Sequence, residues 1–366
     1  MRVLIFEYFT ACEPAAPEFP EGQAMLETLV KSFLETGAHV STITHIDCTS
    51  IGASIRAKPG GGSAVGTGGM SANDGGNTRY GFGAEKLSLI NNPGWAFHCK
   101  RFNELFYDAL SDCNAALVIA PEAEGILFEL TARVERSGRT NLGSTTAGIA
   151  KAQNKFLTYT ILSGKGIKMP HTQPVSDLLN IKNTANLIGY PIVIKPVDGT
   201  GSRGVYLVEK PGELEKAANI AMHAFRSTNK ILLQAYIPGK HVSATMAGGS
   251  TATHPVSLNE QSFDGHKPFA YTGGIVCIDH PDTNRIFETA TLAWDALGGL
   301  RGYGGVDLVI SNNEIYVIEI NPRPTTPLTA LKKCLSNNLA KLLLQALRGE
   351  ELNFVFKQTN LPFKVT

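Results

Sequence analysis

Two apolar runs near the C-terminus, GVDLVI and IYVIEINPRP, predict adjacent antiparallel strands that carry polar residues where burial alone would favour none. In the first run, branched apolar residues alternate around Asp307, and residues 311–313 supply turn-forming side chains. The second run is β-rich from 316 to 320, and Pro322 ends it. The fold must therefore accommodate a hairpin with a polar end.

The polar end of this hairpin has the oxygen ligands of a cation site. Glu319 and Asn321 are two residues apart, so their side chains leave the same face of the sheet. Asp307 lies near that face if the hairpin pairs in the natural register. Mg²⁺ prefers such oxygens and keeps room for phosphate oxygens. The alternative is that Asp307 and Glu319 are salt-bridged residues at strand ends.

The segment IVIKPVDGTGSRGV predicts a strand, a flexible polar loop and a return strand at 205–208. Glycines let backbone N–H groups approach phosphate oxygens, Ser202 and Arg203 add donors, and Lys195 would neutralise an inner phosphate. The segment matches neither the Walker motif nor the dinucleotide fingerprint, because no helix follows the loop. The alternative is an ordinary glycine-rich hairpin with a snorkelling lysine.

A third segment, LLQAYIPGKHVS, lies between these two. Gln234 precedes a bend at residues 237–239, and a new strand starts near Val242. A segment of this kind can hinge two lobes and offer backbone groups to a base.

Residues 140 to 330 resemble the ATP-grasp family of carboxylate–amine ligases. The resemblance lies in the order of the motifs along the chain: Lys155, then Lys195 with its glycine loop, then the hinge at Gln234, then the polar hairpin. The resemblance implies an α/β (α+β) ATP-grasp fold, in which two α+β lobes enclose ATP beside an N-terminal Rossmann-like domain with a parallel sheet. The implied division is an N-terminal domain at 1–140, a central lobe at 141–234, a C-terminal lobe with the metal site at 235–350, and a tail at 351–366.

The resemblance also implies roles for individual residues. Lys155 and Lys195 match the two lysines that bind the nucleotide in this family. Loop 199–204 matches the lid over the triphosphate, and Gln234 matches the residue that faces the adenine. The implied metal is Mg²⁺, with Mn²⁺ as a substitute. The implied ATP-binding residues are Lys155, Lys195, Gly199, Thr200, Gly201, Ser202, Arg203, Gly204, Gln234, Tyr236, Ile237 and His241, and the implied metal ligands are Asp307, Glu319 and Asn321.

Two positions depart from the family pattern. His241 stands where the family usually has a glutamate that holds the ribose, which removes a strong acceptor. Gly305 stands where many relatives have an arginine that steadies the transferring phosphoryl group. That catalytic duty would then fall to Arg301, Arg323 or Arg285, alongside Lys195.

The N-terminal third resembles the tyramine–glutamate ligases of methanofuran-type cofactor biosynthesis, through MRVLIFEYF, EGQAMLETLVKSFLETGAHVSTI and ALVIAPEAEGILFELTARVERSG. This narrower resemblance implies that a glutamate carboxylate is joined to tyramine, tyrosine or a related amine in a methanofuran or methylofuran pathway of one-carbon metabolism.

The same segments have the pattern of βα units. We expect strands at 3–6, 40–43 and 117–120, and helices that include residues 25–33 and 124–136. Ligands of parallel sheets gather at the carboxyl ends of strands, so Glu7 and Glu122 are candidate substrate residues, as is Arg285 in the C-terminal lobe. The alternative for Glu122 is that it caps the helix after it.

Composition excludes several classes of protein. Lys plus Arg number 33 and Asp plus Glu 32, so charge does not favour nucleic acid or an anionic membrane as a partner. No segment is apolar enough over sufficient length to span a membrane, and we expect a cytoplasmic protein.

The six cysteines form no CxxC pair and are expected to be reduced, and the nine histidines show no zinc motif. Residues 59–76 hold eight glycines and predict a mobile insertion at about 57–80.

We therefore expect an ATP-dependent C–N ligase that joins a small amino acid to an amine through an acyl phosphate, and a homodimer is left open. Two alternatives remain. A small-molecule kinase would use the same nucleotide site to phosphorylate an alcohol, and a non-catalytic regulator would bind nucleotide without turnover.

Overall fold

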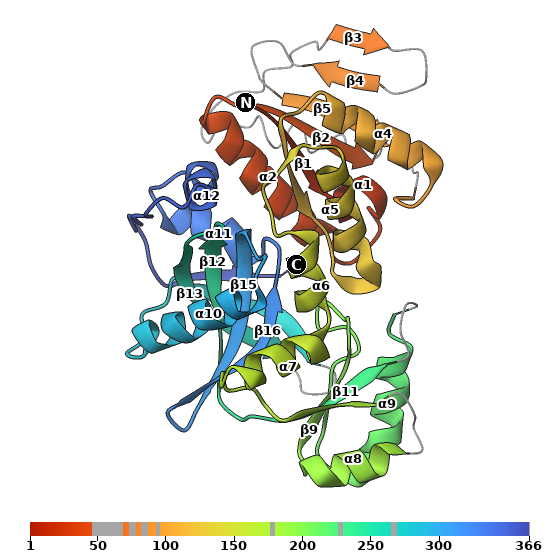
Figure 1. The fold of residues 1–366 in the computed structure, drawn as a ribbon, viewed down its shortest axis with the longest axis vertical. Helices are drawn as coiled ribbons and strands as arrows, with labels where there is room; N and C mark the ends of the chain where they lie inside the picture. Colours follow the sequence, from red (N-terminus) through yellow and green to blue (C-terminus); the bar gives the residue numbers. More distant parts are fainter. Residues whose placement is uncertain are drawn as a thin grey trace.

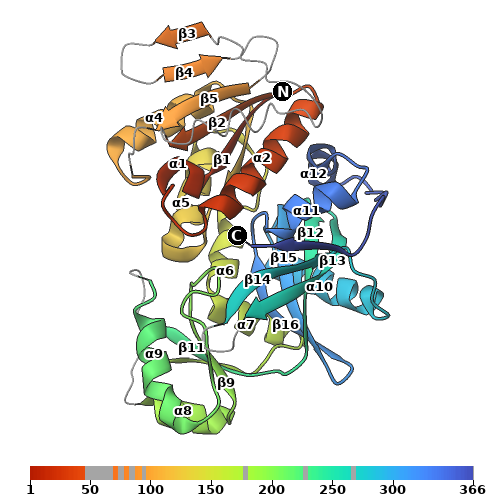
Figure 2. The same cartoon turned by 180° about the vertical axis from the view of Figure 1, so that it is seen from behind.

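A computed structural model describes residues 1–45, 69–72, 78–81, 87–92, 96–175, 180–225, 230–264 and 269–365. Three sheets organise the described residues, and the parts that carry them are stacked along the long axis of the molecule (Figure 1). The N-terminal sheet forms one end, the small central lobe with β9 and β11 the other, and the C-terminal lobe lies beside the junction (Figures 1 and 2).

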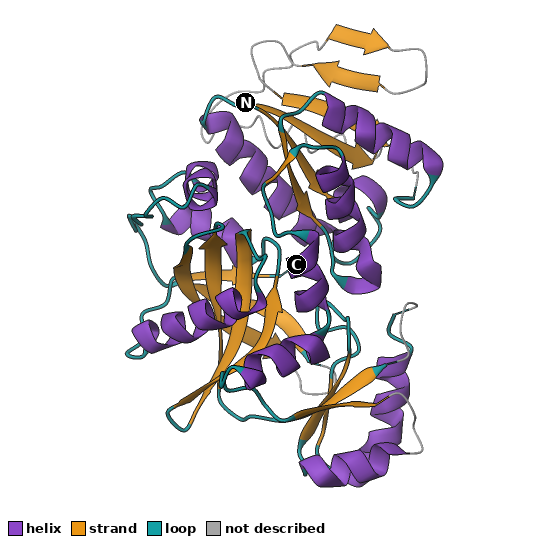
Figure 3. Ribbon diagram, viewed as in Figure 1, coloured by secondary structure: helices purple, strands orange, loops and turns teal. Residues whose placement is uncertain are grey.

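The N-terminal sheet has the order β3-β4-β5-β2-β1-β6-β7, and its strands from β5 to β7 pair in parallel. Helices cover both faces, as a parallel sheet requires (Figure 3). The expected strands and the helix with Met25, Leu29 and Phe33 on one buried face are confirmed. The bounds are β1 Arg2–Glu7, α1 Tyr8–Cys12, α2 Phe19–Glu35, β2 His39–His45, β5 Leu87–Asn92, α4 Lys100–Ser111, β6 Ala115–Ile119, a 3-10 turn Ala123–Gly125, α5 Ile126–Arg136 and β7 Thr140–Asn141.

The glycine-rich insertion lies mostly outside the described residues. Two described pieces, β3 (Gly69–Ala72) and β4 (Thr78–Gly81), pair antiparallel with each other, and β4 pairs with β5 at the sheet edge. These pieces are strands, whereas the sequence predicted a loop. Pairing at an open edge satisfies backbone groups even where few apolar side chains are available.

The central lobe is a four-stranded antiparallel sheet in the order β10-β9-β11-β8. Helices α8 and α9 pack on it through a core that includes Ile181, Ala185 and Leu214. The glycine loop connects β9 to β10, as the sequence predicted. The bounds in this lobe are β8 Thr172–Val175, α8 Ile181–Ile188, β9 Ile192–Pro196, β10 Tyr206–Val208, a 3-10 turn Pro211–Glu213, α9 Leu214–Met222 and β11 Ile231–Ala235. The two helices before it in the chain, α6 Thr146–Gln153 and α7 Lys155–Gly164, pack in the core of the C-terminal lobe instead.

The C-terminal lobe is a six-stranded antiparallel sheet in the order β16-β15-β12-β13-β14-β17. Its last strand comes from the tail, which returns to pair with β14. The bounds are β12 Lys240–Gly248, β13 Thr253–Asp264, β14 Ala270–Val276, α10 Thr283–Leu297, β15 Gly302–Ser311, β16 Glu314–Asn321, α11 Pro327–Cys334, α12 Leu339–Leu347 and β17 Leu361–Lys364.

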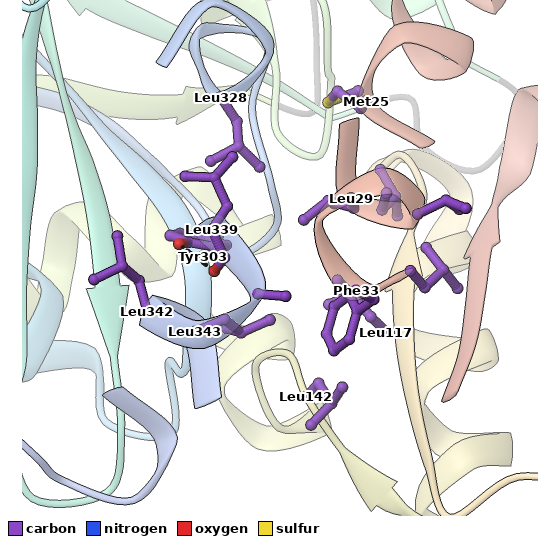
Figure 4. Packing of buried hydrophobic residues seen from close by; sticks show 14 of the residues in the cluster. Met25, Leu29, Phe33, Leu117, Leu142, Tyr303, Leu328, Leu339, Leu342 and Leu343 are labelled. Atoms are coloured by element: carbon purple, nitrogen blue, oxygen red, sulfur yellow. Dashed lines mark hydrogen bonds between the residues drawn. The ribbon is translucent and has the colours of Figure 1, made fainter. Parts of the chain in front are cut away.

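One apolar core joins the N-terminal sheet to the C-terminal lobe. Met25, Leu29 and Phe33 of α2 face Leu339 and Leu343 of α12 (Figure 4). Polar contacts border this core: Lys332 Nζ lies 2.9 Å from Glu35 Oε1, and Asn338 Nδ2 donates to Glu35 Oε2 at 2.7 Å. The shared core fixes α2 beside the C-terminal lobe. In the described part of the chain, no helix combines the length and apolar character that crossing a bilayer would need.

Candidate active site

A cavity of about 460 Å³ draws lining residues from the N-terminal unit, the central lobe and the C-terminal lobe. This volume lies within the usual range for small-ligand sites. Most of the site residues expected from the sequence line it. These are Lys155, Lys195, Gly199, Thr200, Gly201, Ser202, Gln234, Tyr236, Ile237, His241, Asp307, Glu319, Asn321 and Arg323.

Two lysines form the basic side of the cavity. Lys155 is the first residue of α7, and its Nζ donates to the Gly199 carbonyl at 2.7 Å and lies 3.2 Å from Glu319 Oε2. Lys195 on β9 is only 4% exposed and donates to Gln234 Oε1 at 2.9 Å. Burial, opposed by the Glu319 carboxylate, lowers the pKa of Lys195 to about 8. Both ammonium groups therefore lie where phosphate oxygens would be neutralised.

The hairpin of β15 and β16 forms the acidic side. Asp307 pairs directly with Glu319 across the two strands, and Gly305 pairs with Asn321. This register brings the three expected ligands to one end of the hairpin. Asn312 and Asn313 make its turn with φ of 47° and 64°, the left-handed pair that a tight hairpin needs.

The charges on this side favour a cation. Burial and the neighbouring Glu319 carboxylate raise the pKa of Asp307 to about 7. Burial would also raise the pKa of Glu319, but the Lys155 and Lys195 ammonium groups lower it. Asn321 Nδ2 donates to Asp307 Oδ2 at 3.2 Å. The donor set fits Mg²⁺, which uses one or two carboxylates together with phosphate oxygens. Within the described ranges, no group of three or more His, Cys, Asp or Glu side chains forms a metal site independent of a ligand.

The hinge residues have partners that the sequence did not indicate. Gln234 on β11 accepts from Lys195, and its Nε2 donates to Thr172 Oγ1 at 2.9 Å. The residue expected to face an adenine thus lines the cavity and also orients Lys195. His241 lines the cavity, and its ring meets the edge of the Phe263 ring at a centroid distance of 5.0 Å.

The glycine loop is divided between two hollows. Residues 199–202 line the main cavity, whereas Arg203 and Gly204 line a separate hollow beside α9. The Arg203 guanidinium lies 5.1 Å from the centre of the Phe225 ring. Arg203 and Gly204 therefore do not line the main cavity, whereas the other expected ATP-binding residues do.

Glu7 and Arg285 also lie outside the cavity lining. Glu7 is buried as the N-cap of α1 and accepts from Phe9 N and Thr10 N at 3.2 and 2.8 Å. Arg285 donates to Asp282 Oδ1 and to the Asn313 carbonyl at the turn of the hairpin.

Arg301 precedes β15 and exchanges hydrogen bonds with Ser144 through its backbone. Because Arg301 and Asp307 are six residues apart along extended chain, they lie roughly 20 Å apart. The structure thus leaves Arg323 as the arginine that lines the cavity among the three considered.

Glu122 follows β6 and is 5% exposed. It makes no side-chain cap to the turn after it, contrary to the capping alternative. Its carboxylate lies 3.0 Å from Arg323 Nε instead. Burial alone would lower the pKa of Arg323, but the carboxylates of Glu122 and Glu21 raise it.

Sequence reasoning missed Glu18 and Glu21 at the start of α2, and Gln261 and Tyr271 on β13 and β14, all of which line the cavity. Gln261 Nε2 donates to Asp307 Oδ1 at 3.1 Å. Glu21 lies in the first turn of α2, the long helix after the carboxyl end of β1 and the short helix α1, and this position could have indicated it. Gln261 and Tyr271 reach the cavity only through sheet pairing, for which the sequence carries no local signal.

The family follows from the match between this chain and known domains. Residues 152–327 match the ATP-grasp domain, and residues 92–149 match the pre ATP-grasp 3 domain. The chain is also similar to the tyramine–L-glutamate ligase of Methanocaldococcus fervens, with 34% identity over 239 residues, which are 65% of this chain and 68% of the relative. The chain belongs to the ATP-grasp family.

Two further similarities agree with the ATP-grasp assignment. The tyramine–L-glutamate ligase of Methanocaldococcus jannaschii is 34% identical over 242 residues, 66% of this chain and 65% of that protein, so the match spans slightly under two thirds of its length. The biotin carboxylase domain of Hydrogenobacter thermophilus 2-oxoglutarate carboxylase, a dimer in complex with MgADP and bicarbonate, has the same fold. Its TM-score is 0.70 at 17% identity, over 98% of this chain and 72% of that one. The fold class expected from the sequence is confirmed.

Proposed function

We propose that this ATP-grasp protein is an ATP-dependent carboxylate–amine ligase that joins glutamate to tyramine, tyrosine or a related aromatic amine. The observation that carries the proposal is the distribution of charge in one cavity. The lining of this cavity combines two lysines and a carboxylate pair with an arginine, further carboxylates and aromatic rings. The 34% identical relatives named as tyramine–L-glutamate ligases support the choice of substrates.

The nucleotide side holds the triphosphate. Lys155 and Lys195 neutralise phosphate oxygens, and residues 199–202 offer backbone donors. Asp307, Glu319 and the Asn321 amide would hold Mg²⁺, which supplies charge stabilisation for phosphoryl transfer when bound. Because Lys195 has a lowered pKa of about 8, it is still mostly cationic near pH 7.

The reaction begins at the acid. A carboxylate oxygen of the acid attacks the γ-phosphorus of ATP and ADP leaves, which gives an acyl phosphate. The amine nitrogen then attacks the acyl carbon, the C–O bond to phosphate breaks, and phosphate and a proton are released. Arg323 suits the acid side because a guanidinium binds carboxylate or phosphate oxygens in pairs.

The amine side has an acidic and an aromatic component. Glu21 lines the cavity, and its carboxylate raises the pKa of Arg323. Tyr271 contributes an aromatic ring, and burial together with the carboxylates of Asp307 and Glu21 raises the pKa of its hydroxyl. Phe263 and Phe269 also line the cavity, but they lie against His241 and Tyr236. An aromatic amine combines the ring and the ammonium group that such a surface would accept.

The test is an assay with ATP, Mg²⁺ and glutamate, with and without tyramine, tyrosine or simple amines. We expect ADP, phosphate and one amide in equal amounts, and only when acid and amine are both present. Lys195→Ala should abolish this turnover while thermal unfolding stays cooperative, because the phosphates lose a buried cation.

Mass analysis of the product distinguishes the alternatives. A phosphorylated substrate with no amide would show a kinase. Nucleotide binding without turnover across the whole panel of acids and amines would show a regulator. Either result would refute the ligase proposal.

A further inference from the structure

Three parts of the chain meet at Arg323. Its Nε lies 3.0 Å from Glu122 Oε1, and Nε also donates to Glu122 Oε2 at 3.1 Å, so it is bound to the N-terminal unit. Its Nη2 donates to Thr200 Oγ1 of the glycine loop at 3.1 Å. Thr200 Oγ1 in turn donates to Glu122 Oε2 at 3.2 Å. The three side chains, one from each unit, form a closed ring of hydrogen bonds.

This ring is sheltered from solvent. The Arg323 side chain is 16% exposed and the Glu122 side chain 7%. Charged hydrogen bonds in such surroundings are stronger than exposed ones, and breaking one leaves a buried charge that lacks its partner. The ring can therefore hold the loop in place.

The ring borders the cavity that the proposed reaction would use. Arg323 and Thr200 both line the cavity, whereas Glu122 does not. Of the five N–H groups of a guanidinium, Nε donates to Glu122, Nη1 to the Pro324 carbonyl and Nη2 to Thr200. One N–H on each terminal nitrogen has no partner among the described residues, so Arg323 can still bind an oxyanion while it stays in the ring.

Thr200 is also well placed within the loop. Lys155 Nζ holds the Gly199 carbonyl on the lysine side of the cavity at 2.7 Å. The next residue, Thr200, accepts a hydrogen bond from Arg323 and donates one to Glu122. Adjacent loop residues thus bind Lys155 and the Arg323–Glu122 pair.

We propose that Glu122 is a positioning residue that latches loop 199–204 to Arg323 over the acyl end of the cavity and keeps water from the acyl phosphate. This inference rests on the proposed ligase function. Without the latch, a water oxygen attacks the acyl carbon, the C–O bond to phosphate breaks, and the acid is regenerated with free phosphate. ATP is then consumed without amide formation.

The direct test is the amount of phosphate released per amide formed. We expect a ratio near one for the wild type. Thr200→Val removes the hydroxyl at constant shape and should raise the phosphate released in excess of amide about ten- to hundredfold, the effect expected for loss of a hydrogen bond to a charged group. Thr200→Ser restores the hydroxyl and should restore the ratio. Glu122→Gln keeps the shape but removes the charge, and should raise the ratio as Thr200→Val does.

The matched control is Glu124→Gln, the same chemical change two residues away at an exposed position outside the cavity lining. It should leave the ratio at the wild-type value. A purely structural loss would lower kcat without changing the ratio. An unchanged ratio in both Thr200→Val and Glu122→Gln would overturn the latch while leaving the ligase proposal intact.

A second measurement does not depend on turnover. With Mg²⁺ and a non-hydrolysable ATP analogue bound, amide hydrogen exchange in residues 199–204 should be slower in the wild type and Thr200→Ser than in Thr200→Val. Equal exchange in all three proteins would overturn the latch. If the wild type forms no amide, the ligase proposal fails, and this exchange comparison still decides whether the latch exists.

Discussion

Glu7 and Glu122 both follow buried strands of the N-terminal sheet, yet their carboxylates have different partners. Glu7 caps α1 through backbone N–H groups, whereas Glu122 reaches Arg323 in the C-terminal lobe. The position of both at the carboxyl ends of parallel strands could be read from the sequence. Their partners could not, because the partner of Glu122 is about 200 residues away in the chain.

The first prediction at this scale concerns the pH dependence of stability. Burial raises the pKa of Glu7 from 4.5 to about 7. A carboxyl group with a raised folded-state pKa stabilises the fold fully below pH 4.5, and this stability is lost as the pH rises through 7. The Gln side chain in Glu7→Gln keeps an acceptor but cannot ionise. Between pH 5 and pH 8 the free energy of unfolding of the wild type should therefore fall by about 2 to 3 kcal/mol relative to that of Glu7→Gln.

Urea unfolding of both proteins across this pH range measures the difference. Glu13→Gln, nearby in the chain, is a control for loss of an acidic side chain; it keeps Glu7 and should therefore lose stability between pH 5 and pH 8 as the wild type does. A stability difference between wild type and Glu7→Gln that stays constant from pH 5 to 8 would contradict the prediction.

Among the elements, the β15–β16 hairpin was the best predicted. Its turn and its alternation lie within twenty residues, so local patterns set the pairing of Asp307 with Glu319. The same reasoning could not place Gln261 or Tyr271, because their access to the cavity depends on how β13 and β14 pair within the larger sheet. Local sequence patterns thus predicted the position of the carboxylate pair, whereas the positions of Gln261 and Tyr271 depend on long-range strand pairing.

The second prediction belongs to the hinge between β11 and β12. A Cβ on Gly239 would lie 2.2 Å from the Ile310 carbonyl oxygen, which belongs to the neighbouring strand. Gly239→Ala should therefore push the start of β12 away from β15 and lower stability by about 1 to 3 kcal/mol. Because Tyr236 and Ile237 line the cavity just before this point, affinity for ATP should fall as well.

Urea unfolding and nucleotide titration test this prediction together. Gly212→Ala is the matched control, since a Cβ there would meet nothing within 4 Å. Its stability and ATP affinity should stay close to those of the wild type. Equal behaviour of the two alanine variants would show that the hinge is not held by this close approach.

In the whole molecule, the cavity exists only where all three units come together. The resemblance to a family predicted the order of the lobes, and the structural similarity confirms the fold. The contact of α2 with α11 and α12 was not predicted, because amphipathic patterns show which helix face is buried but not which partner covers it. That contact brings Glu18 and Glu21 to the cavity, so the missed packing and the missed site residues have one cause.

The last prediction concerns ligand binding by the assembled molecule. If the cavity binds a magnesium nucleotide, a non-hydrolysable ATP analogue at a hundredfold excess over its Kd should add about 2.7 kcal/mol to the free energy of unfolding. Much of this gain should depend on Mg²⁺ and disappear with EDTA, because the carboxylates of Asp307 and Glu319 repel the triphosphate when no cation lies between them.

Two variants of β16 test which residues hold the cation. For each, the increase in the free energy of unfolding on binding the ATP analogue is measured with and without Mg²⁺. Glu319→Gln removes a carboxylate from the cavity and should lose most of the Mg²⁺-dependent part. Glu314→Gln removes an exposed carboxylate, paired with Lys168, at the other end of the same strand and should keep it. Since each variant serves as its own reference without Mg²⁺, loss of the ion pair between Glu319 and Lys155 cancels from the comparison. A full Mg²⁺-dependent gain in Glu319→Gln would place the cation elsewhere in the molecule.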